Sequence, residues 1–267
     1  MAKIVPLPTR AFGAEPGQPD VPALAGWIAD HRGTAADLLA YLLDRSLAPQ
    51  LEAGITDPCA GGLFCRDRVL GQLTGLNKKQ DTATGEIDTE GTALAEDAAM
   101  LAAQKKNVWC ALPAPHTLGI TDAYYDDEGE WGEALADAYR RIMRDMRDAG
   151  IGGHVLVCKQ ADEEEIAALA RPNVFFFVPG ATKADLGTLM ECQRVVAVTP
   201  ARLSDVFDLA NEYELHRLIV TDPDNDAIRQ ALSHLDPDQV TVGGYCTDAE
   251  DPDAYWAALV KSAVYRK

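Results

Sequence analysis

Basic residues are scarce for the length of the chain. Its 267 residues include 24 Lys and Arg against 42 Asp and Glu, which gives a formal net charge of −18. A surface of this sign repels nucleic acid and anionic membranes. No stripe of Lys or Arg with interleaved aromatic residues occurs that would mark a nucleic-acid interface. We therefore expect no nucleic-acid partner.

Long hydrophobic runs are lacking as well. No segment reaches the roughly 18 consecutive apolar residues of a membrane-spanning helix, although 47% of the residues are hydrophobic. The opening sequence, MAKIVPLPTR, does not combine a basic segment with an apolar core as a secretory signal does. These features predict a cytoplasmic protein that has no membrane partner and enough apolar residues for a large core.

Cysteine is present, but without the spacing of a disulfide framework or a zinc knuckle. The chain has six cysteines, and its closest pair has the pattern Cys59-x5-Cys65. In a cytoplasmic protein we expect these thiols to be reduced, and most of them to be small buried residues.

Short apolar runs alternate with helical stretches along the whole chain. Eight of these runs are predicted to be strands: residues 3–7, 55–57, 108–112, 154–158, 173–178, 194–199, 218–221 and 239–242. Eight such units, in a chain somewhat longer than about 250 residues, are typical of the (β/α)8 TIM barrel. We predict a single barrel domain over residues 1–267, with a polar excursion near residues 75–89.

Chemically able side chains follow several of the predicted strands. In a parallel barrel the catalytic groups gather at the C-terminal ends of the strands. The residues predicted to lie there are Asp57, His116, Cys158, Lys159, Asp222 and Cys246. Catalytic roles are predicted for His116, Asp57, Lys159 and Asp222. Thr117 in the turn that contains His116, and Tyr245 after the last strand, are predicted to contact the substrate.

His116 and Lys159 each allow two interpretations. His116 can act as a general acid or base near neutral pH, or it can be a loop histidine bonded to the backbone. Lys159 can bind an anionic group or, if it is desolvated, form a Schiff base. Alternatively it is an exposed lysine that pairs with Asp162 or Glu163.

Cys158 and Cys246 are candidate metal ligands, because thiolates and imidazole in tetrahedral geometry suit Zn²⁺. Together with His116 and Cys59 they can form such a set, and zinc is the one cofactor considered. The alternative is that each cysteine is a small buried residue at a strand end.

Arg66 and Arg68 are candidate substrate-binding residues that can clamp a carboxylate or phosphate. The alternative is an ion pair with Asp67 or another nearby acid. The acidic runs at 126–128 and 162–165 precede or open helices, where negative charge favours the helix dipole without any ligand.

Three segments resemble one known enzyme family. LEAGITDPCAGGLFCRDRVLGQLTGL is similar to the second strand and helix junction of the cobalamin-independent methionine synthase C-terminal domain. ALPAPHTLGITDAYYDDEGEWGEALADAYRRIMRDMRDAGIGGHVLV resembles the third and fourth strands of that family, with its Pro-x-Pro-x-Thr turn. PLPTRAFGAEP is similar to the start of the family's barrel.

The resemblance implies a (β/α)8 barrel, as in uroporphyrinogen decarboxylase-like proteins, and methyl transfer to a thiol activated by zinc. Cys246 matches the last zinc ligand of the family, and Asp222 matches an Asp at the end of its seventh strand. Cys158, Lys159 and Gln160 replace an Asp-Glu-Pro that binds the amino-acid substrate, and the family's His-x-Cys and Glu ligands are not matched. The resemblance therefore implies a different substrate from that of methionine synthase.

The leading hypothesis is a methyltransferase-like enzyme that acts on a small thiol or related one-carbon substrate. Any methyl donor is expected on a separate carrier, of which a corrinoid protein is one candidate. One alternative is a metal-free decarboxylase or lyase that acts on a carboxylated small molecule. A catalytically inactive barrel that serves as a binding subunit is the other.

Overall fold

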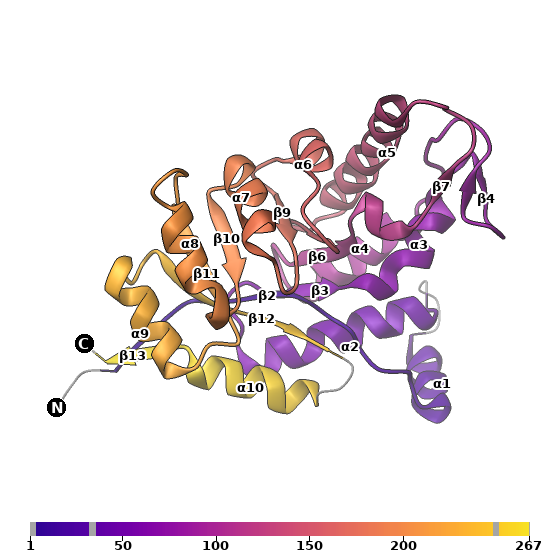
Figure 1. Ribbon diagram of the computed structural model, residues 1–267. Helices are drawn as coiled ribbons and strands as arrows, with labels where there is room; N and C mark the ends of the chain where they lie inside the picture. The colour runs from indigo at the N-terminus through magenta and orange to yellow at the C-terminus, as the bar shows by residue number, and fades with distance from the viewer. Residues whose placement is uncertain (1–3, 32–35, 248–250, 267) are drawn as a thin grey trace.

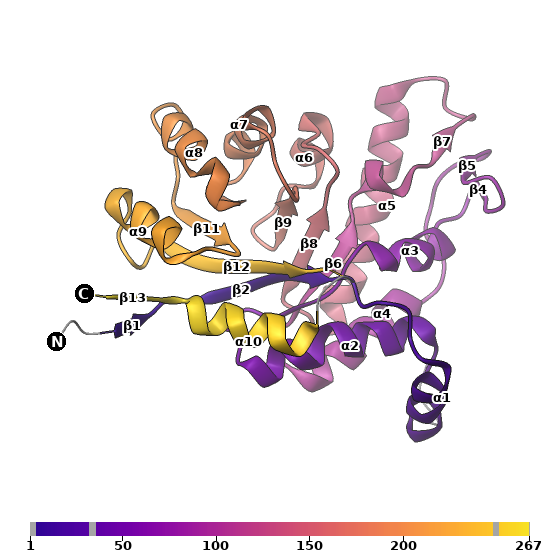
Figure 2. The same ribbon diagram turned by 60° about the horizontal axis from the view of Figure 1, so that its bottom comes forward.

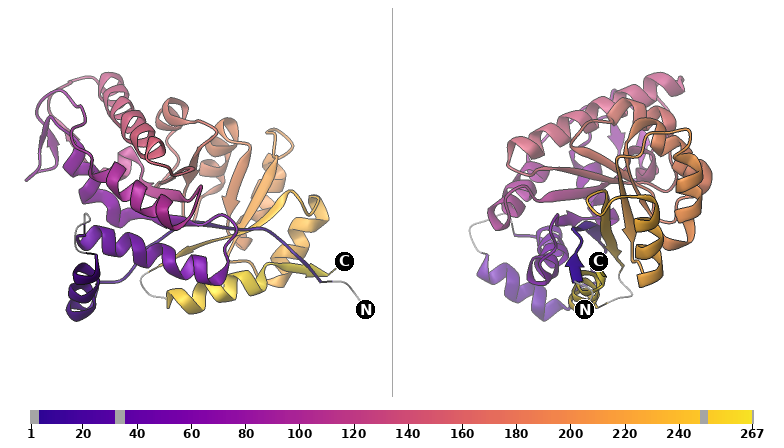
Figure 3. Two further views of the ribbon diagram at one scale, coloured as in Figure 1. Left: turned by 180° about the vertical axis from the view of Figure 1, so that it is seen from behind. Right: turned by 90° about the vertical axis from the view of Figure 1, so that its left-hand side faces the viewer.

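A computed structural model describes residues 4–31, 36–247 and 251–266 of the chain. The fold is mixed α/β, with parallel strands in the centre and helices outside them (Figures 1 and 3). One four-stranded parallel sheet has the order β10 (Val195–Val198), β11 (Arg217–Thr221), β12 (Val240–Cys246) and β2 (Thr9–Ala14). The other has the order β3 (Cys59–Gly61), β6 (Trp109–Pro113), β8 (Gly153–Val157) and β9 (Val174–Phe177).

A single parallel bridge between Arg10 and Asp57 joins the two sheets where β2 passes the segment before β3. Within the described ranges no ladder connects β9 to β10. The predicted parallel α/β fold is confirmed, but its described strands form two four-stranded sheets joined at one edge, and a closed eight-stranded barrel is not shown. The side chain of Gln193 occupies the free edge of β9, where it accepts from the Phe176 amide and donates to the Phe176 carbonyl, both at 3.1 Å.

The helices surround the strands in chain order. They are α1 (Val21–Asp30), α2 (Leu38–Ala53), α3 (Arg66–Gln72), α4 (Ala93–Gln104), α5 (Glu128–Asp148), α6 (Glu163–Leu169), α7 (Lys183–Cys192), α8 (Leu203–Leu209), α9 (Asn225–His234) and α10 (Pro252–Ser262). Short 3-10 turns lie at three loops: η1 (Leu63–Cys65), η2 (Pro115–Leu118) and η3 (Pro200–Arg202). Within the described residues, no helix is long and apolar enough to cross a membrane.

Two small sheets lie outside the parallel strands. Strand β1 (Ile4–Pro6) pairs antiparallel with β13 (Val264–Arg266), so the two ends of the described chain lie side by side (Figure 2). Strands β4 (Leu76–Asn77) and β5 (Thr82–Ala83) form a hairpin that β7 (Thr121–Asp122) extends. The polar segment at residues 75–89 contains this hairpin.

Aspartate side chains begin many of the helices, which explains why acidic residues precede so many helical stretches. Asp127, Asp162 and Asp224 each accept a hydrogen bond from an amide in the first turn, of α5, α6 and α9 respectively. An N-terminal helix cap of this kind contributes about 1 kcal/mol. These aspartates therefore have a local structural role and need no ligand.

The predicted strands at 108–112, 154–158, 173–178, 194–199 and 218–221 are confirmed, to within one residue at each end, as β6, β8, β9, β10 and β11. Strands of a parallel sheet that are covered on both faces show as continuous apolar runs, and these five segments have that pattern.

The predictions for strands one and two are wrong in position. Of the predicted strand 3–7, the described residues 4–7 lie outside the parallel sheets, where Ile4–Pro6 forms β1, and the inner strand is β2. Pro6 and Pro8 lack amide protons, which suits this segment to an edge. The second strand is Cys59–Gly61 rather than 55–57, because three small residues fit there beside β6 with no side chain exposed.

Aromatic rings fill the space between the sheets. Phe12 of β2 stacks on Phe177 at 4.4 Å and on Phe175 at 5.2 Å between ring centroids. The guanidinium of Arg10 lies 4.3 Å from the centroid of the Trp109 ring. The centre of the fold is therefore a packed core rather than an open channel.

His154 in β8 is fully buried, and its Nε2 lies 3.1 Å from the Met143 carbonyl. Burial lowers the pKa of this ring from 6.5 to about 4. The unfolded chain therefore takes up a proton between pH 6.5 and 4 that the folded chain does not, and stability is lost as the pH falls through this range. By linkage this loss approaches about 3 kcal/mol.

We expect His154→Gln, which stays neutral, to lose less stability than the wild type between pH 6.5 and 4 in urea unfolding measured by circular dichroism. Exposed His234→Gln serves as the matched control and should keep the wild-type pH dependence. Parallel curves for His154→Gln and the wild type would contradict this assignment.

Candidate active site

His116 lies at the C-terminal end of β6, in the turn η2. Its Nδ1 is 3.0 Å from Oε1 of Glu165, and its backbone amide donates to Oε2 of the same carboxylate at 2.8 Å. Glu165 belongs to the first turn of α6, whose cap Asp162 accepts from the Glu165 amide at 2.9 Å. The imidazole and the carboxylate are therefore held together by two loops that follow neighbouring strands.

The Glu165 carboxylate fixes the tautomer of the ring. An ionised carboxylate can only accept, so Nδ1 carries the proton and Nε2 offers a lone pair. The Lys159 amide lies 3.4 Å from Nε2, at the outer limit of a hydrogen bond. Nε2 is thus the atom at which this histidine can take up a proton.

The charge of Glu165 also sets the pKa of His116. Partial burial of the ring works to lower the pKa, but the hydrogen bond to Glu165 and its negative charge outweigh that effect, and the pKa lies above its ordinary value of 6.5. The two side chains are 22% and 10% exposed. A histidine with an acceptor at Nε2 and a carboxylate that stabilises its protonated form is suited to act as a general base.

The partner of His116 was not predicted from the sequence. Glu165 belongs to the acidic run 162–165, for which the helix dipole was thought a sufficient reason. The sequence feature that could have indicated this role is the position of Glu165, the third residue of α6 after its cap Asp162. A side chain at this position points back toward the C-terminal end of β8. The alternative for Lys159, an ion pair with Asp162 or Glu163, is not observed within the described part of the chain. Lys159 is exposed beside the ring.

A small cavity of about 130 Å³ lies at the C-terminal ends of β9, β10, β11 and β12. Phe177, Thr199, Arg202, Asp222 and Tyr245 are among its lining residues. Phe177 also accepts a hydrogen bond from the Cys158 amide at 2.8 Å, so this cavity lies one strand away from the Lys159 loop. His116 does not line the cavity itself, but both belong to the same end of the fold.

Asp222 and Tyr245, two of the predicted site residues, meet at this cavity. Asp222 has a φ of 46° and accepts from the Tyr255 hydroxyl at 2.6 Å. A non-glycine residue in this backbone region is uncommon and is found often at functional sites. The Tyr245 hydroxyl bonds to Glu15, which follows β2, and burial together with this carboxylate raises the pKa of Tyr245. Glu15 was not predicted from the sequence.

Cys158 and Cys246 are both buried at strand ends. The Cys158 thiol lies 3.4 Å from the Leu156 carbonyl, and the Cys246 thiol lies 3.7 Å from the Thr247 carbonyl. Burial raises the pKa of the Cys158 thiol well above its ordinary range, and the negative charge of Glu165 adds to this effect. This thiol is protonated at neutral pH, and a metal ligand or nucleophile requires the thiolate.

The zinc prediction can be compared with the arrangement of donors. Among residues 4–31, 36–247 and 251–266, no three His, Cys, Asp or Glu side chains come together as a metal-binding group. In this arrangement Cys158, Cys246, Cys59 and His116 do not form the predicted zinc set.

Asp57 lies at the opposite end of the fold from the position predicted for it. Its amide donates to the Thr9 carbonyl and its carbonyl accepts from the Ala11 amide, both at 3.0 Å, beside the beginning of β2. The predicted strand ended at residue 57, but β3 begins at Cys59. Asp57 therefore precedes the strand instead of lying at its C-terminal end. It does not share an end with His116.

Arg66 and Arg68 form ion pairs with nearby acidic residues, which was the alternative to a role in substrate binding. Arg66 pairs with Asp81 at 2.5 Å and with Asp67 at 3.3 Å. Arg68 pairs with Asp37 at 2.7 Å and with the buried Asp97 at 3.0 Å. Burial raises the pKa of Asp97 to about 6, although Arg68 opposes this effect.

Thr117 is buried in η2 next to His116. Its hydroxyl oxygen has no hydrogen-bond partner in the part of the chain that the structure describes. Its predicted substrate contact stays a prediction.

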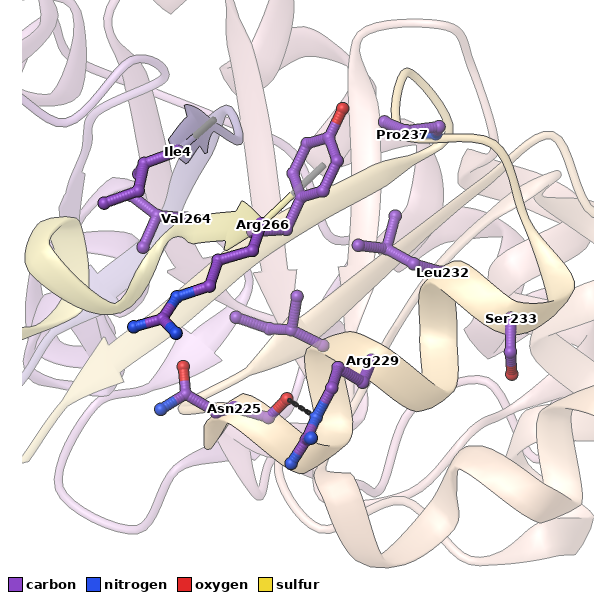
Figure 4. A pocket seen from close by; sticks show the side chains of 10 residues that line it. Ile4, Asn225, Arg229, Leu232, Ser233, Pro237, Val264 and Arg266 are labelled. Atoms are coloured by element: carbon purple, nitrogen blue, oxygen red, sulfur yellow. Dashed lines mark hydrogen bonds between the residues drawn. The ribbon is translucent and has the colours of Figure 1, made fainter. Parts of the chain in front are cut away.

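A larger cavity, of about 710 Å³, lies between α9 and the β1–β13 ribbon (Figure 4). Leu232, Val264 and Ile4 line it, and Arg229 and Arg266 lie at its edge (Figure 4). It contains none of the predicted site residues and lies away from the C-terminal ends of the parallel strands.

The burial of the thiols predicts their reactivity. Cys192 is exposed, whereas Cys59, Cys65, Cys110, Cys158 and Cys246 are buried. We expect one equivalent of thiol to react rapidly with Ellman's reagent in the native protein and all six after unfolding, because a buried, protonated thiol is a poor nucleophile. The Cys192→Ser variant should show no rapid phase. A rapid second equivalent would indicate an accessible thiolate at another position.

In comparison with solved structures, this parallel α/β fold is similar to that of methionine synthase-like proteins. A proposed vitamin-B12-independent methionine synthase from Listeria monocytogenes superimposes with a TM-score of 0.69 at 18% identity, over 94% of this chain and 95% of that one. A B12-independent methionine synthase from Shewanella sp. W3-18-1, in complex with selenomethionine, gives 0.67 at 16% identity, over 97% and 96%. At such identities the likeness shows a shared fold.

No protein-family model and no curated protein sequence matches the chain. The fold match extends over nearly the full length of both chains in each pair.

Proposed function

We propose that this protein is a methyltransferase-like enzyme that transfers a methyl group to a small thiol at the C-terminal ends of its parallel strands. The observation that carries the proposal is the His116–Glu165 pair, which lies at that end with Nε2 of the ring able to accept a proton. The full-length fold match to B12-independent methionine synthases supports the reaction class. In this proposal the two sheets act as one (β/α)8 barrel.

The proposed reaction begins with proton transfer. Nε2 of His116 takes the proton from the substrate thiol, while Glu165 stabilises the imidazolium that forms. The thiolate sulfur then attacks the methyl carbon, a carbon–sulfur bond forms, and the donor leaves with the electron pair of its bond to the methyl group. His116 afterwards releases its proton to solvent.

Residues around the cavity would select a small acceptor. The cavity has a volume of about 130 Å³, and Arg202 lines it as a cation for an anionic substituent of the acceptor, whose thiol would lie toward His116 at the same end of the fold. Lys159 and Gln160 stand where the family resemblance implies an acidic clamp for an amino acid. We therefore propose an acceptor other than the amino-acid substrate of methionine synthase.

The direct test is transfer of a ¹³C-labelled methyl group. Labelled methylcobalamin, methylated folate and S-adenosylmethionine are each incubated with cysteine, homocysteine and 2-mercaptoethanesulfonate, and the labelled thioether is detected by mass spectrometry. At least one pair should give a product above the rate without protein. Absence of product and of saturable thiol binding across the panel would overturn the proposal.

A metal-free decarboxylase or lyase is the second candidate. Arg202 and the Thr199 and Thr221 side chains at the same cavity favour it, because they can hold a carboxylate. Release of CO₂ from a carboxylated substrate, abolished in Arg202→Ala and independent of any methyl donor, would distinguish this candidate from methyl transfer.

A further inference from the structure

A second cavity, of about 620 Å³, lies at the N-terminal ends of the strands. It is formed where β9 and β10 are not paired, and the residues that begin these strands, Val174 and Val195, line it. Gln193, which bonds the free edge of β9, forms part of its wall. The cavity is thus at the opposite end of the fold from His116.

Arg10 lines this cavity from inside the fold. Its guanidinium lies over the rings of Trp109 at 4.3 Å and Phe175 at 5.2 Å. Neither Nε nor Nη2 has a hydrogen-bond partner in the described chain, and the same is true of the buried Thr241 hydroxyl, which also lines the cavity. Buried polar groups are normally paired, so unpaired ones beside a cavity require an explanation.

Further arginines surround the opening. Arg171, Arg194 and Arg217 are exposed lining residues, in a chain whose net charge is −18. Glu214 pairs with Arg194 at 3.2 Å and with His216 at 2.6 Å. Within the described ranges, the Arg217 side chain takes part in no ion pair.

Asp57 is the acidic residue among the described lining residues. Burial lowers the pKa of the Arg10 guanidinium, and the negative charge of Asp57 opposes this effect. Asp57 and Glu214, which pairs with Arg194, are two carboxylates against four arginines. The cavity is therefore a local concentration of positive charge on an acidic protein, and charged walls of this kind attract small anions.

We propose that this cavity binds a small molecule that carries a carboxylate or phosphate group on an aromatic or apolar body. The anionic group would meet Arg10 and Arg217. The body would lie against Trp109, Phe175 and Ile219, which supply the apolar part of the wall. The volume is within the range of small-molecule sites, about 300–1,000 Å³. The proposal does not depend on methyl transfer at the other end of the fold.

The test uses phenyl phosphate and benzoate as probes, with benzyl alcohol as the neutral control, in calorimetric titrations of the full-length protein at low salt. Both anions should bind saturably and benzyl alcohol should not. Arg217→Ala should weaken binding about tenfold or more, since a charge-assisted hydrogen bond is lost. Arg217 is exposed, so its replacement should leave the fold intact.

Arg45→Ala is the matched control, because Arg45 is an exposed arginine of α2 away from the cavity. This variant removes the same charge and should bind both probes as the wild type does. Equal weakening in Arg45→Ala and Arg217→Ala would mean non-specific attraction and would overturn the proposal. So would the absence of saturable binding to the wild-type protein.

Discussion

His116→Gln lowers the proposed methyl-transfer rate by a factor of about 10² to 10⁴, the usual contribution of a general base. Glutamine can keep a hydrogen bond toward Glu165, but it has no basic nitrogen in place of Nε2. The measurement is the initial rate of labelled thioether formation at saturating thiol. Wild-type circular dichroism and urea midpoint would show that the fold is unchanged.

His234→Gln is the matched control, because His234 is an exposed histidine at the end of α9. Its rate should equal that of the wild type. A His116→Gln variant that retained the full rate would remove His116 from the mechanism, whatever the activity of the protein.

The pH profile provides a separate test of the same pair. The wild-type rate should rise with pH through a value above 6.5, because only neutral His116 accepts a proton and Glu165 raises its pKa. In Glu165→Gln the charge is gone and burial dominates, so the inflection should move to lower pH. An unchanged inflection would mean that another group sets the profile.

Gly61→Ala is expected to reduce the free energy of unfolding by about 3 kcal/mol or more, since it combines overpacking with backbone strain. Gly61 ends β3 with a φ of 86°, and a Cβ there would lie 2.4 Å from the Ala111 carbonyl oxygen of β6. The oxygen belongs to a strand that pairs on both sides and cannot move aside. Urea unfolding measures the change.

Gly187→Ala is the control for that substitution. Gly187 lies inside α7, where an added Cβ meets nothing within 4 Å. Alanine is the better helix former, so stability should rise by about 0.5–1 kcal/mol. If Gly61→Ala were as stable as the wild type, the close approach of β3 and β6 would be wrong.

The sequence predicted the strands that bury apolar residues on both faces, and it missed those that do not follow this pattern. Val155, Leu156 and Val157 of β8 are all buried, so the segment shows as an uninterrupted apolar run. Strand β2 contains Arg10, whose charge is covered by the Trp109 ring across the fold. A contact between residues so far apart in the chain cannot be read from local hydrophobicity.

The second strand was not predicted correctly because it consists of small residues. Ala60 and Gly61 have little intrinsic preference for extended structure. They form β3 because only side chains of this size fit beside Ala111 and Ser46. The Ser46 hydroxyl accepts a hydrogen bond from the Gly61 amide at 3.0 Å. The strand is selected by packing, and the placement of Asp57 was wrong as a consequence.

The sequence predicted where His116 lies in the fold, but it did not predict that Glu165 is its hydrogen-bond partner. His116 follows a buried strand and a proline, which places it at the C-terminal end of β6 from the sequence alone. Its partner Glu165 depends on the orientation of α6 relative to η2. That orientation follows from the packing of two strand-to-helix connections, and neither contains a motif that specifies it.

The most direct test of the proposed site is a nuclear magnetic resonance titration of the histidine rings with and without a small thiol acceptor. The His116 ring should titrate above pH 6.5, and its signal should shift saturably when the thiol is added, while the His234 ring stays unchanged. A thiol that bound without any effect on His116, or a His116 pKa below 6.5, would contradict the assignment of this residue as the base.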